Sequence, residues 1–212
     1  MPAPSKVAVA LYQLFAQGTI WPHLIATFSA ALGGLVVGTV LGATAALTPL
    51  VGELLAPVMI ALNAVPRVAL APLFVIWFGI GLGSKVALSF ILVAVLIFFT
   101  VFTGIRDVDR RLVERVVTLG GGRVALLREV YGPSVVAWIL GNLKVAVGFA
   151  FTGAVVGEFV AATKGLGYLL SFAQSSYNAA LMMALVLLIM GFVLLLFGLT
   201  GWLERRLLRW RG

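Results

Sequence analysis

Long apolar stretches recur along the chain, and each is close to the length that crosses a bilayer. A helix needs about 20 mostly apolar residues to span the hydrocarbon core. Five stretches meet this requirement, over residues 23–47, 54–79, 85–105, 134–160 and 179–203. The pattern predicts an all-α fold, a polytopic membrane helix bundle of about five transmembrane helices.

Two segments depart from a simple crossing helix. Residues 54–79 contain Pro57, Pro66 and Pro72. Because proline removes a backbone hydrogen bond and clashes with the preceding turn, we expect this span to be kinked or broken. Residues 6–20 are partly apolar but too short to cross, which predicts a short amphipathic or interfacial segment.

Composition agrees with a membrane location. The chain is 62% hydrophobic and 10% charged, whereas a soluble domain carries about 25% charged residues. We interpret residues 1–212 as a single transmembrane domain. The absence of Cys excludes disulfides, and with His23 as the single histidine there is no cluster typical of zinc. We therefore expect no metal site and no cofactor.

The net charge of +8 is unevenly distributed along the chain. In a soluble protein it would suggest nucleic acid, but cytoplasmic loops of membrane proteins collect Lys and Arg, so no nucleic-acid partner is expected. One predicted side of the membrane holds ten such residues, six in segment 106–133 and four in the tail: Arg205, Arg206, Arg209 and Arg211. The other side holds three: Lys6, Lys85 and Lys164. The count predicts a cytoplasmic loop and C-terminus and an external N-terminus.

Small residues at four-residue spacing mark one face of two spans. These residues are Gly34, Gly38 and Gly42 in the first span, and Gly153, Gly157 and Ala161 in the fourth. Such residues let helix backbones approach closely in lipid. Ordinary packing inside the bundle explains them most simply, and a face toward another subunit or a transport path is the alternative.

Segment 106–133 holds ten of the chain's 22 charged residues, although a turn between two spans needs only a few residues. Its pattern predicts two short helices, 107–119 and 123–130. Apolar residues follow helical spacing in the first, with Arg110, Arg111, Glu114 and Arg115 on the wetter side. Gly120–Gly122 should end it, and Gly132–Pro133 should close the second. Both a docking surface for a soluble partner and a solvated loop on lipid headgroups fit this pattern.

The spacing of Glu114, Gly120, Val130 and Pro133 resembles the "EAA" loop of permease subunits of bacterial ABC importers. Arg115 and other residues replace some of that motif's Ala, Ile and Leu positions. Further stretches resemble the permeases of nitrate, sulfonate, taurine and pyrimidine-precursor importers. They are TIWPHLIATFS (19–29), AVPRVALAPLFVIWFGIGLGSK (64–85), GIRDVDRRLVERVVTLGGGR (104–123), VVGEFVAATKGLGYLL (155–170) and LERRLLRW (203–210).

The resemblance implies a type I ABC importer permease fold in the bacterial inner membrane. It also implies that segment 106–133 is a cytoplasmic coupling loop, seated in a cleft of a separate ATPase. Glu114 would form an ion pair there beside Arg110, Arg111 and Arg115, and Gly120 would set the angle between the two short helices. The implied partners are two cytoplasmic ATP-binding subunits, a second permease copy and an external substrate-binding protein, besides membrane lipid.

The chain itself shows no catalytic constellation, so we do not expect it to be an enzyme. A Walker A motif is absent, and the nearest approach, GIGLGSK (79–85), has the wrong order. ATP hydrolysis would then belong to a partner subunit. A stand-alone channel or transporter without an ATPase, or a lipid-modifying membrane enzyme, is the rival class. One histidine and no cysteine weigh against an enzyme.

Ionisable residues inside spans are costly in lipid and are therefore candidates for a translocation path. Arg67, with Asn63 four residues earlier, and Lys144 and Glu158 meet this description. Snorkelling or a pair between helices could also explain Arg67, a structural hydrogen bond Lys144, and an interfacial position Glu158. Segment 165–167 is most simply a turn, with a contact to the binding protein as the alternative. The two cations suggest a small anion such as nitrate, a sulfonate or bicarbonate, although similar permeases handle neutral pyrimidine precursors.

Overall fold

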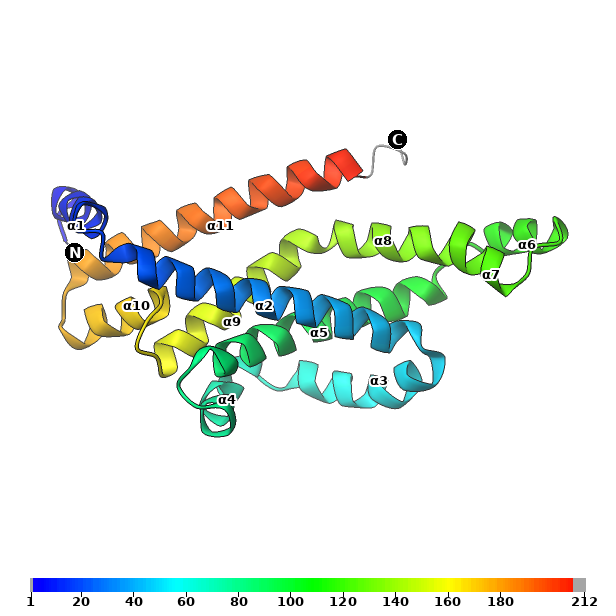
Figure 1. Ribbon diagram of the computed structural model, residues 1–212, viewed down its shortest axis with the longest axis horizontal. Helices are drawn as coiled ribbons and strands as arrows, with labels where there is room; N and C mark the ends of the chain where they lie inside the picture. Colours follow the sequence, from blue (N-terminus) through cyan, green and yellow to red (C-terminus); the bar gives the residue numbers. More distant parts are fainter. Residues whose placement is uncertain (1, 208–212) are drawn as a thin grey trace.

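Helices account for all regular structure in the computed structural model, which describes residues 2–207 (Figure 1). The α-helices are α1 Pro4–Ala16, α2 Ile20–Leu47, α3 Pro49–Ala64, α4 Ala71–Phe78, α5 Leu82–Arg106, α6 Arg110–Thr118, α7 Arg123–Leu126, α8 Gly132–Gly141, α9 Leu143–Val160, α10 Leu166–Ser175 and α11 Ala179–Leu207. A 3₁₀ turn, Arg67–Leu70, joins α3 to α4, and a π-helical turn, Leu127–Tyr131, joins α7 to α8. The all-α prediction is confirmed.

The centre of the bundle is made by α2, α5 and α9, which pack along one another (Figure 1). The predicted small-residue face of α2 lies against α5: a Cβ added at Gly34 would come 2.1 Å from Cβ of Ser89. On α9, a Cβ added at Gly153 would come 2.6 Å from Cα of the same Ser89. Ser89 also donates a hydrogen bond of 2.8 Å to the Ala150 carbonyl. Close backbone packing inside one chain therefore accounts for these glycines.

The predicted second span, 54–79, is two helices rather than one. Helices α3 and α4 meet at an angle of 97°, and the break falls at Pro66 and the 3₁₀ turn after it. Proline at this position cannot continue the helix, because it lacks the N–H and disfavours helical geometry in the residue before it. Pro57, in contrast, lies inside α3. The expected break is confirmed, and its size makes the segment a broken span or a re-entrant loop.

The predicted fourth span, 134–160, is also divided. Helix α8 ends at Gly141 and α9 begins at Leu143, with the break at Asn142. The Trp138 carbonyl accepts hydrogen bonds from both the Asn142 backbone N–H and the Asn142 side-chain amide, each at 3.1 Å. Five helical stretches, including 123–141, are long and apolar enough to cross a membrane, and the bent α3–α4 pair would make a sixth.

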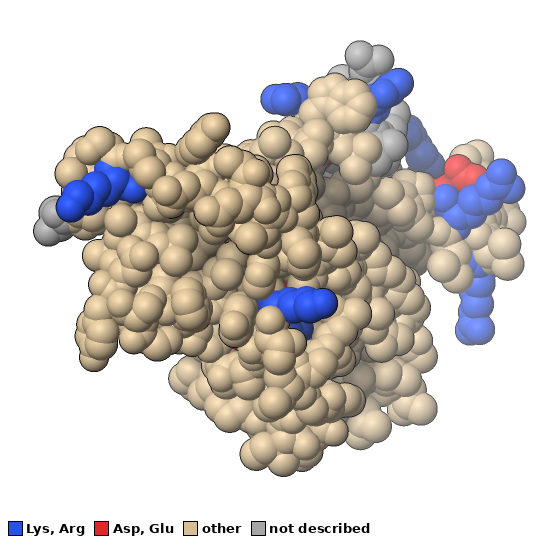
Figure 2. All heavy atoms as spheres, turned by 60° about the vertical axis from the view of Figure 1, so that its left-hand side comes forward, with Lys and Arg blue, Asp and Glu red and all other residues tan. Residues whose placement is uncertain are grey.

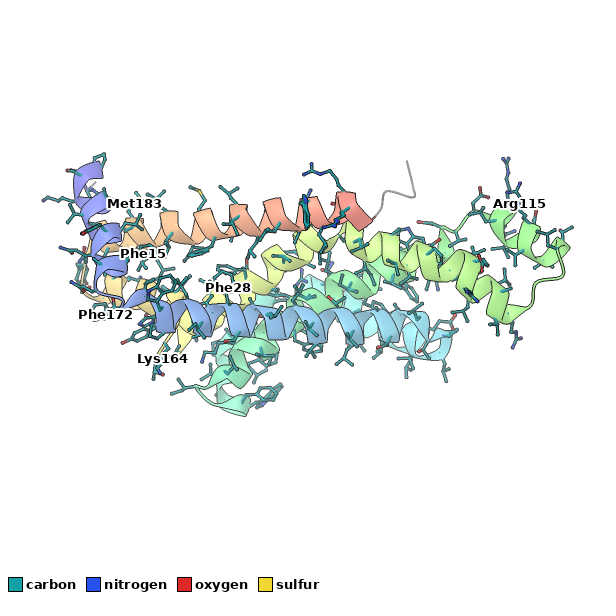
Figure 3. All side chains as sticks on the ribbon, turned by 45° about the horizontal axis from the view of Figure 1, so that its top comes forward. Phe15, Phe28, Arg115, Lys164, Phe172 and Met183 are labelled. Carbon is teal, nitrogen blue, oxygen red and sulfur yellow. The ribbon has the colours of Figure 1, made fainter. Side chains whose placement is uncertain are left out.

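The two ends of the molecule differ in character. Helices α1 and α10 lie at one end, and α6 and α7 project from the other, toward which α11 runs (Figure 1). In Figure 3, Lys164 and Arg115 mark these opposite ends. Figure 2 looks onto the first end and shows few charged atoms on its near surface. Helix α1, with 13 residues, agrees with the predicted N-terminal segment in being too short to cross, whereas α10 was not predicted. Arg209 and Arg211, which entered the charge count, lie outside the described residues.

Candidate functional site

Four of the five predicted coupling residues lie on α6, which projects beyond the membrane-spanning helices, and Gly120 follows it (Figure 1). Asp109 caps the helix, because its carboxylate accepts a hydrogen bond of 2.9 Å from the Arg111 N–H. The helix therefore begins at Arg110, three residues later than predicted. Its solvent-exposed residues include both charged and apolar side chains: Arg110, Arg111, Leu112, Glu114, Arg115 and Val117.

A tight turn connects α6 to the next helix. Gly120 adopts φ of +81°, a conformation that side chains disfavour, which agrees with its predicted role in turning the chain. A Cβ added at Gly121 would meet Val116 Cγ1 at 2.5 Å, so the turn also packs closely onto α6. The arrangement fixes the direction of α6 relative to α7.

The second loop helix does not end at Gly132–Pro133 as predicted. It continues through the π-helical turn into α8, so that residues 123–141 form one helical stretch. The wider π turn ends at Tyr131, two residues before Pro133, whose ring would clash with the carbonyl four residues earlier in a regular α-helix. The loop helix that begins at Arg123 and the following span are therefore joined without a flexible linker.

Two of the four predicted path residues share one pocket. Asn63, at the end of α3, and Arg67, at the bend, line a cavity of about 470 Å³ with residues of α5 and α9. The Arg67 guanidinium carbon lies 5.5 Å from the centre of the Phe149 ring. Sequence reasoning did not single out Phe149, because one phenylalanine in an apolar span carries no distinguishing signal. The bend between α3 and α4 is what brings Arg67 to this ring.

Lys144 lies elsewhere, against α11. Its Nζ is 3.7 Å from the Glu204 carboxylate, and the two side chains are 47% and 28% exposed. A Cβ added at Gly201 would come 2.8 Å from Lys144 Cε, so the absence of a side chain there makes room for the lysine. The structure therefore shows a contact between two helices for Lys144 and does not bring it to Arg67.

Glu158 is buried near the end of α9, with only 2% of the residue exposed. Its Oε2 accepts hydrogen bonds from Thr27 Oγ1 at 2.8 Å and from the Gly167 N–H at 3.0 Å. Thr27 Oγ1 in turn accepts from the Leu166 N–H at 2.8 Å. One carboxyl group thus joins α2, α9 and the start of α10.

The segment 165–167, expected to be a turn, is shaped to fit this carboxyl group. Gly165 has φ of +121°, and a Cβ added there would lie 2.1 Å from Cδ of Glu158. A Cβ at Gly167 would lie 2.0 Å from the Val155 carbonyl oxygen. The Gly165 N–H also donates to His23 Nδ1 at 3.0 Å, and the His23 ring stacks on Tyr168. Neighbouring atoms therefore leave no room for a side chain at Gly165 or Gly167, and both positions require glycine.

Lys85, which was counted only as an outer-side charge, completes this polar region. It is 3% exposed, and its Nζ donates to Ser84 Oγ at 3.2 Å and to the carbonyls of Ile80 and Ala161. The Ala161 carbonyl follows the last turn of α9, where a cation is favourable to the helix dipole. Lys85 and Glu158 also line a cavity of about 190 Å³. We refer to His23, Thr27, Lys85, Glu158 and the segment 165–167 as the polar lock.

Within residues 2–207, no three His, Cys, Asp or Glu side chains gather in a way that could hold a metal ion. Every buried side-chain nitrogen and oxygen in this part of the chain has a hydrogen-bond partner.

Comparison with known proteins identifies the fold and the relatives. Residues 34–209 match the family described as "Binding-protein-dependent transport system inner membrane component". The chain is 38% identical to the riboflavin transport system permease protein of Chloroflexus aurantiacus, over 100% of this chain and 81% of that protein. It is 32% identical to the taurine transport system permease protein of Escherichia coli K12, over 100% and 80%. A crystal structure of an amino acid ABC transporter with histidines superimposes with a TM-score of 0.76 at 19% identity, covering 97% and 100%.

Proposed function

Since this chain belongs to the family of binding-protein-dependent inner-membrane transport components, and is a permease subunit of the ABC importer type, we propose that it is driven by a separate ATPase through segment 106–133. The observation that carries this proposal is the position of α6. It projects from one end of the bundle and exposes charged and apolar side chains together (Figure 3). A solvated helix needs only the charges, whereas a protein interface also uses the apolar residues.

The connection from α6 into the bundle suits it to transmitting movement. The Gly120–Gly121 turn packs onto α6, and the following helical stretch, 123–141, runs without a break into the membrane region. Helix α9 follows at Asn142 and contributes Phe149 to the Arg67 pocket. A rigid displacement of α6 would therefore reach the pocket through two packed helices, as alternating access between inward-open and outward-open states requires.

The translocation path in this proposal runs along the face that carries Asn63 and Arg67. Asn63 is exposed and Arg67 half-buried on the surface of this one chain. Lipid would not tolerate an unpaired guanidinium there, so the face belongs against a second permease copy with a path between the two. Segment 106–133 and the C-terminus are cytoplasmic in this arrangement. The N-terminus, α1 and α10 face outward, toward a substrate-binding protein.

The substrate in this proposal is a small anion or small polar organic molecule. Relatives are named for riboflavin, taurine, formylaminopyrimidine and aliphatic sulfonates. These names span several chemical classes, so the family alone does not select one. An external binding protein would make most of the selection, and the permease would accept what it delivers.

The substitution Glu114→Ala tests the coupling contact. We expect about 2 kcal/mol or more of lost association with the ATPase, roughly a 30-fold weaker Kd, because a desolvated charge partner would be left unpaired. Membrane insertion should be unchanged. The measurement is co-purification of the tagged permease with a co-expressed candidate ATPase subunit, together with uptake into vesicles.

The matched control is Glu129→Ala, in the same loop, where the carboxylate lies 3.8 Å from Arg128 and both side chains are mostly exposed. It should leave association intact. Normal co-purification and uptake in Glu114→Ala would refute this coupling contact. Uptake by the wild-type permease without any associated ATPase would favour the rival channel.

A further inference from the structure

The Arg67 pocket has a composition that is unusual for a cavity between membrane-spanning helices. It lies where α3 ends, against α5 and α9, and has a volume of about 470 Å³, within the range of small-molecule sites. Besides apolar residues of α5, it is lined by one cation, one amide, two hydroxyls and two aromatic rings: Asn63, Arg67, Phe99, Thr100, Thr103 and Phe149.

The charge in this pocket is not balanced by the chain. Both ion pairs found within residues 2–207 lie elsewhere, at Arg128–Glu129 and Lys144–Glu204. No Asp or Glu lines the cavity. Because an uncompensated cation inside the membrane is costly, the missing negative charge is expected to come from a bound molecule. A guanidinium offers several N–H donors in a planar fork, which suits a carboxylate, sulfonate or phosphate.

The aromatic rings add a second requirement. Arg67 lies 5.5 Å from the centre of the Phe149 ring, at a distance where the cation is attracted to the ring face. Phe99 lines the same cavity from α5. The hydroxyls of Thr100 and Thr103 already donate hydrogen bonds to backbone carbonyls of their own helix. Toward the cavity they can therefore only accept hydrogen bonds. A flat ring fits beside Phe149 with its acidic group at Arg67.

We propose that this pocket binds aromatic or heteroaromatic anions during transport, with the anionic oxygens at Arg67 and the ring beside Phe149 and Phe99. The inference rests on the proposed path and adds the chemical class of its cargo. Small inorganic anions would use only the arginine, and cations are rejected because no carboxylate lines the cavity.

The absence of cysteine in the whole chain allows a direct test. Asn63→Cys places a single thiol at the rim of the pocket, at an exposed position where the change should not disturb folding. The full-length permease in native membranes is treated with two methanethiosulfonates, one carrying a sulfonate and one a trimethylammonium group. The quantity compared is the ratio of the two labelling rates, anionic reagent over cationic reagent. We expect this ratio to be about ten, because the Arg67 charge lies nearby.

Two variants control this ratio. Ser176→Cys lies exposed at the end of α10 and reports the intrinsic reactivity of the two reagents. Arg67→Gln in the Asn63→Cys background should return the ratio to the Ser176→Cys value. Equal ratios in the Asn63→Cys variant with and without Arg67 would overturn the charge assignment. Reaction at Ser176→Cys with none at Asn63→Cys would overturn the pocket as a water-accessible site.

Protection from labelling then tests the ring. The probes are benzoate, cyclohexanecarboxylate of the same charge without the aromatic ring, and benzylamine with the ring and the opposite charge. Benzoate at about twice its Kd should slow labelling about threefold, and the other two should not. Equal protection by cyclohexanecarboxylate, or by benzylamine, would overturn the aromatic-anion class. Neither result affects association with the ATPase, so this class can fail while the proposed function stands.

Discussion

Two charged side chains in the membrane-spanning region have opposite surroundings. Glu158 is 2% exposed, and the chain supplies hydrogen bonds to it from α2 and α10. Arg67 is half-buried, lies over a ring, and has no carboxylate beside it within residues 2–207. Both would be equally conspicuous in a hydropathy plot. The difference leads us to expect that Glu158 serves the scaffold, whereas Arg67 is available to a ligand.

The polar lock holds together elements that are distant in sequence. Thr27 and Glu158 are 131 positions apart, and His23 and Gly165 are 142 apart. Their contacts fix α10 against α2 and α9 at the end of the molecule opposite α6 (Figure 1). Removing one member of such a buried hydrogen-bond network leaves its partners without hydrogen bonds, which costs far more stability than losing a surface contact. The lock should therefore control assembly, and the Arg67 pocket should control transport.

The largest effect is expected from Gly167→Ala in the polar lock. The new Cβ would lie 2.0 Å from the Val155 carbonyl oxygen, and relieving that clash must displace the N–H that donates to Glu158. We expect a loss of about 3 kcal/mol of stability and little folded protein. The measurement is the thermal midpoint of the detergent-solubilised permease, followed by size-exclusion chromatography after heating.

Gly198→Ala is the control for this change. Gly198 lies in α11 with nothing within 4 Å of an added Cβ, so alanine should be neutral or slightly stabilising through its better helix propensity. If Gly167→Ala and Gly198→Ala melted at the same temperature, the close approach around Glu158 would not stabilise the fold.

The next effect is expected from Arg67→Ala, which should separate transport from assembly. Uptake should fall about tenfold or more, the equivalent of one charge-assisted hydrogen bond, while the thermal midpoint stays near the wild-type value. Arg67→Lys should recover part of the uptake, because it keeps the charge but not the planar fork. Both variants are measured by uptake in cells at matched expression levels.

Arg206→Ala provides the comparison for Arg67. Arg206 also lies over an aromatic ring, 5.1 Å from the centre of Trp202, but near the end of α11 and far from the pocket. A similar loss of uptake in Arg206→Ala would mean that removing any arginine that lies over an aromatic ring impairs uptake, and that the Arg67 result is not specific to the pocket. Unchanged uptake in Arg67→Ala would return Arg67 to a structural role.

The sequence predicted the parts of this fold that follow from length and hydropathy. Apolar runs of about 20 residues gave the positions of α2, α5 and α11 within a few residues, and Pro66 marked the break after α3. The 97° bend could not be predicted, because proline ends a helix without setting the direction of the next one. The continuation of α7 into α8 was also missed, since a π turn accommodates a proline that normally ends a helix.

The candidate site was predictable only in part, because its contacts join residues that are far apart in the sequence. Asn63 and Arg67 line one pocket, but the helical spacing on which they were paired is interrupted at Pro66, so their proximity follows from the bend and not from a shared helix face. Burial of Glu158 depends on Thr27 and on α10, and hydropathy carries no information about such distant partners. Gly165 and Gly167 were the available signal, since two glycines two positions apart beside a carboxylate-bearing helix indicate a close backbone approach.

The smallest effect is expected from Lys144→Ala, which tests whether a third cation belongs with Arg67 or with the scaffold. Lys144 and Glu204 are 3.7 Å apart and both are partly exposed, so their pair should contribute no more than about 1 kcal/mol. Lys144→Ala, Glu204→Ala and the double variant form a cycle that isolates this pair in thermal midpoints. Uptake should remain close to wild type in all three. A large uptake defect in Lys144→Ala with a normal midpoint would instead place Lys144 on the path, because a scaffold contact cannot slow transport while leaving stability unchanged.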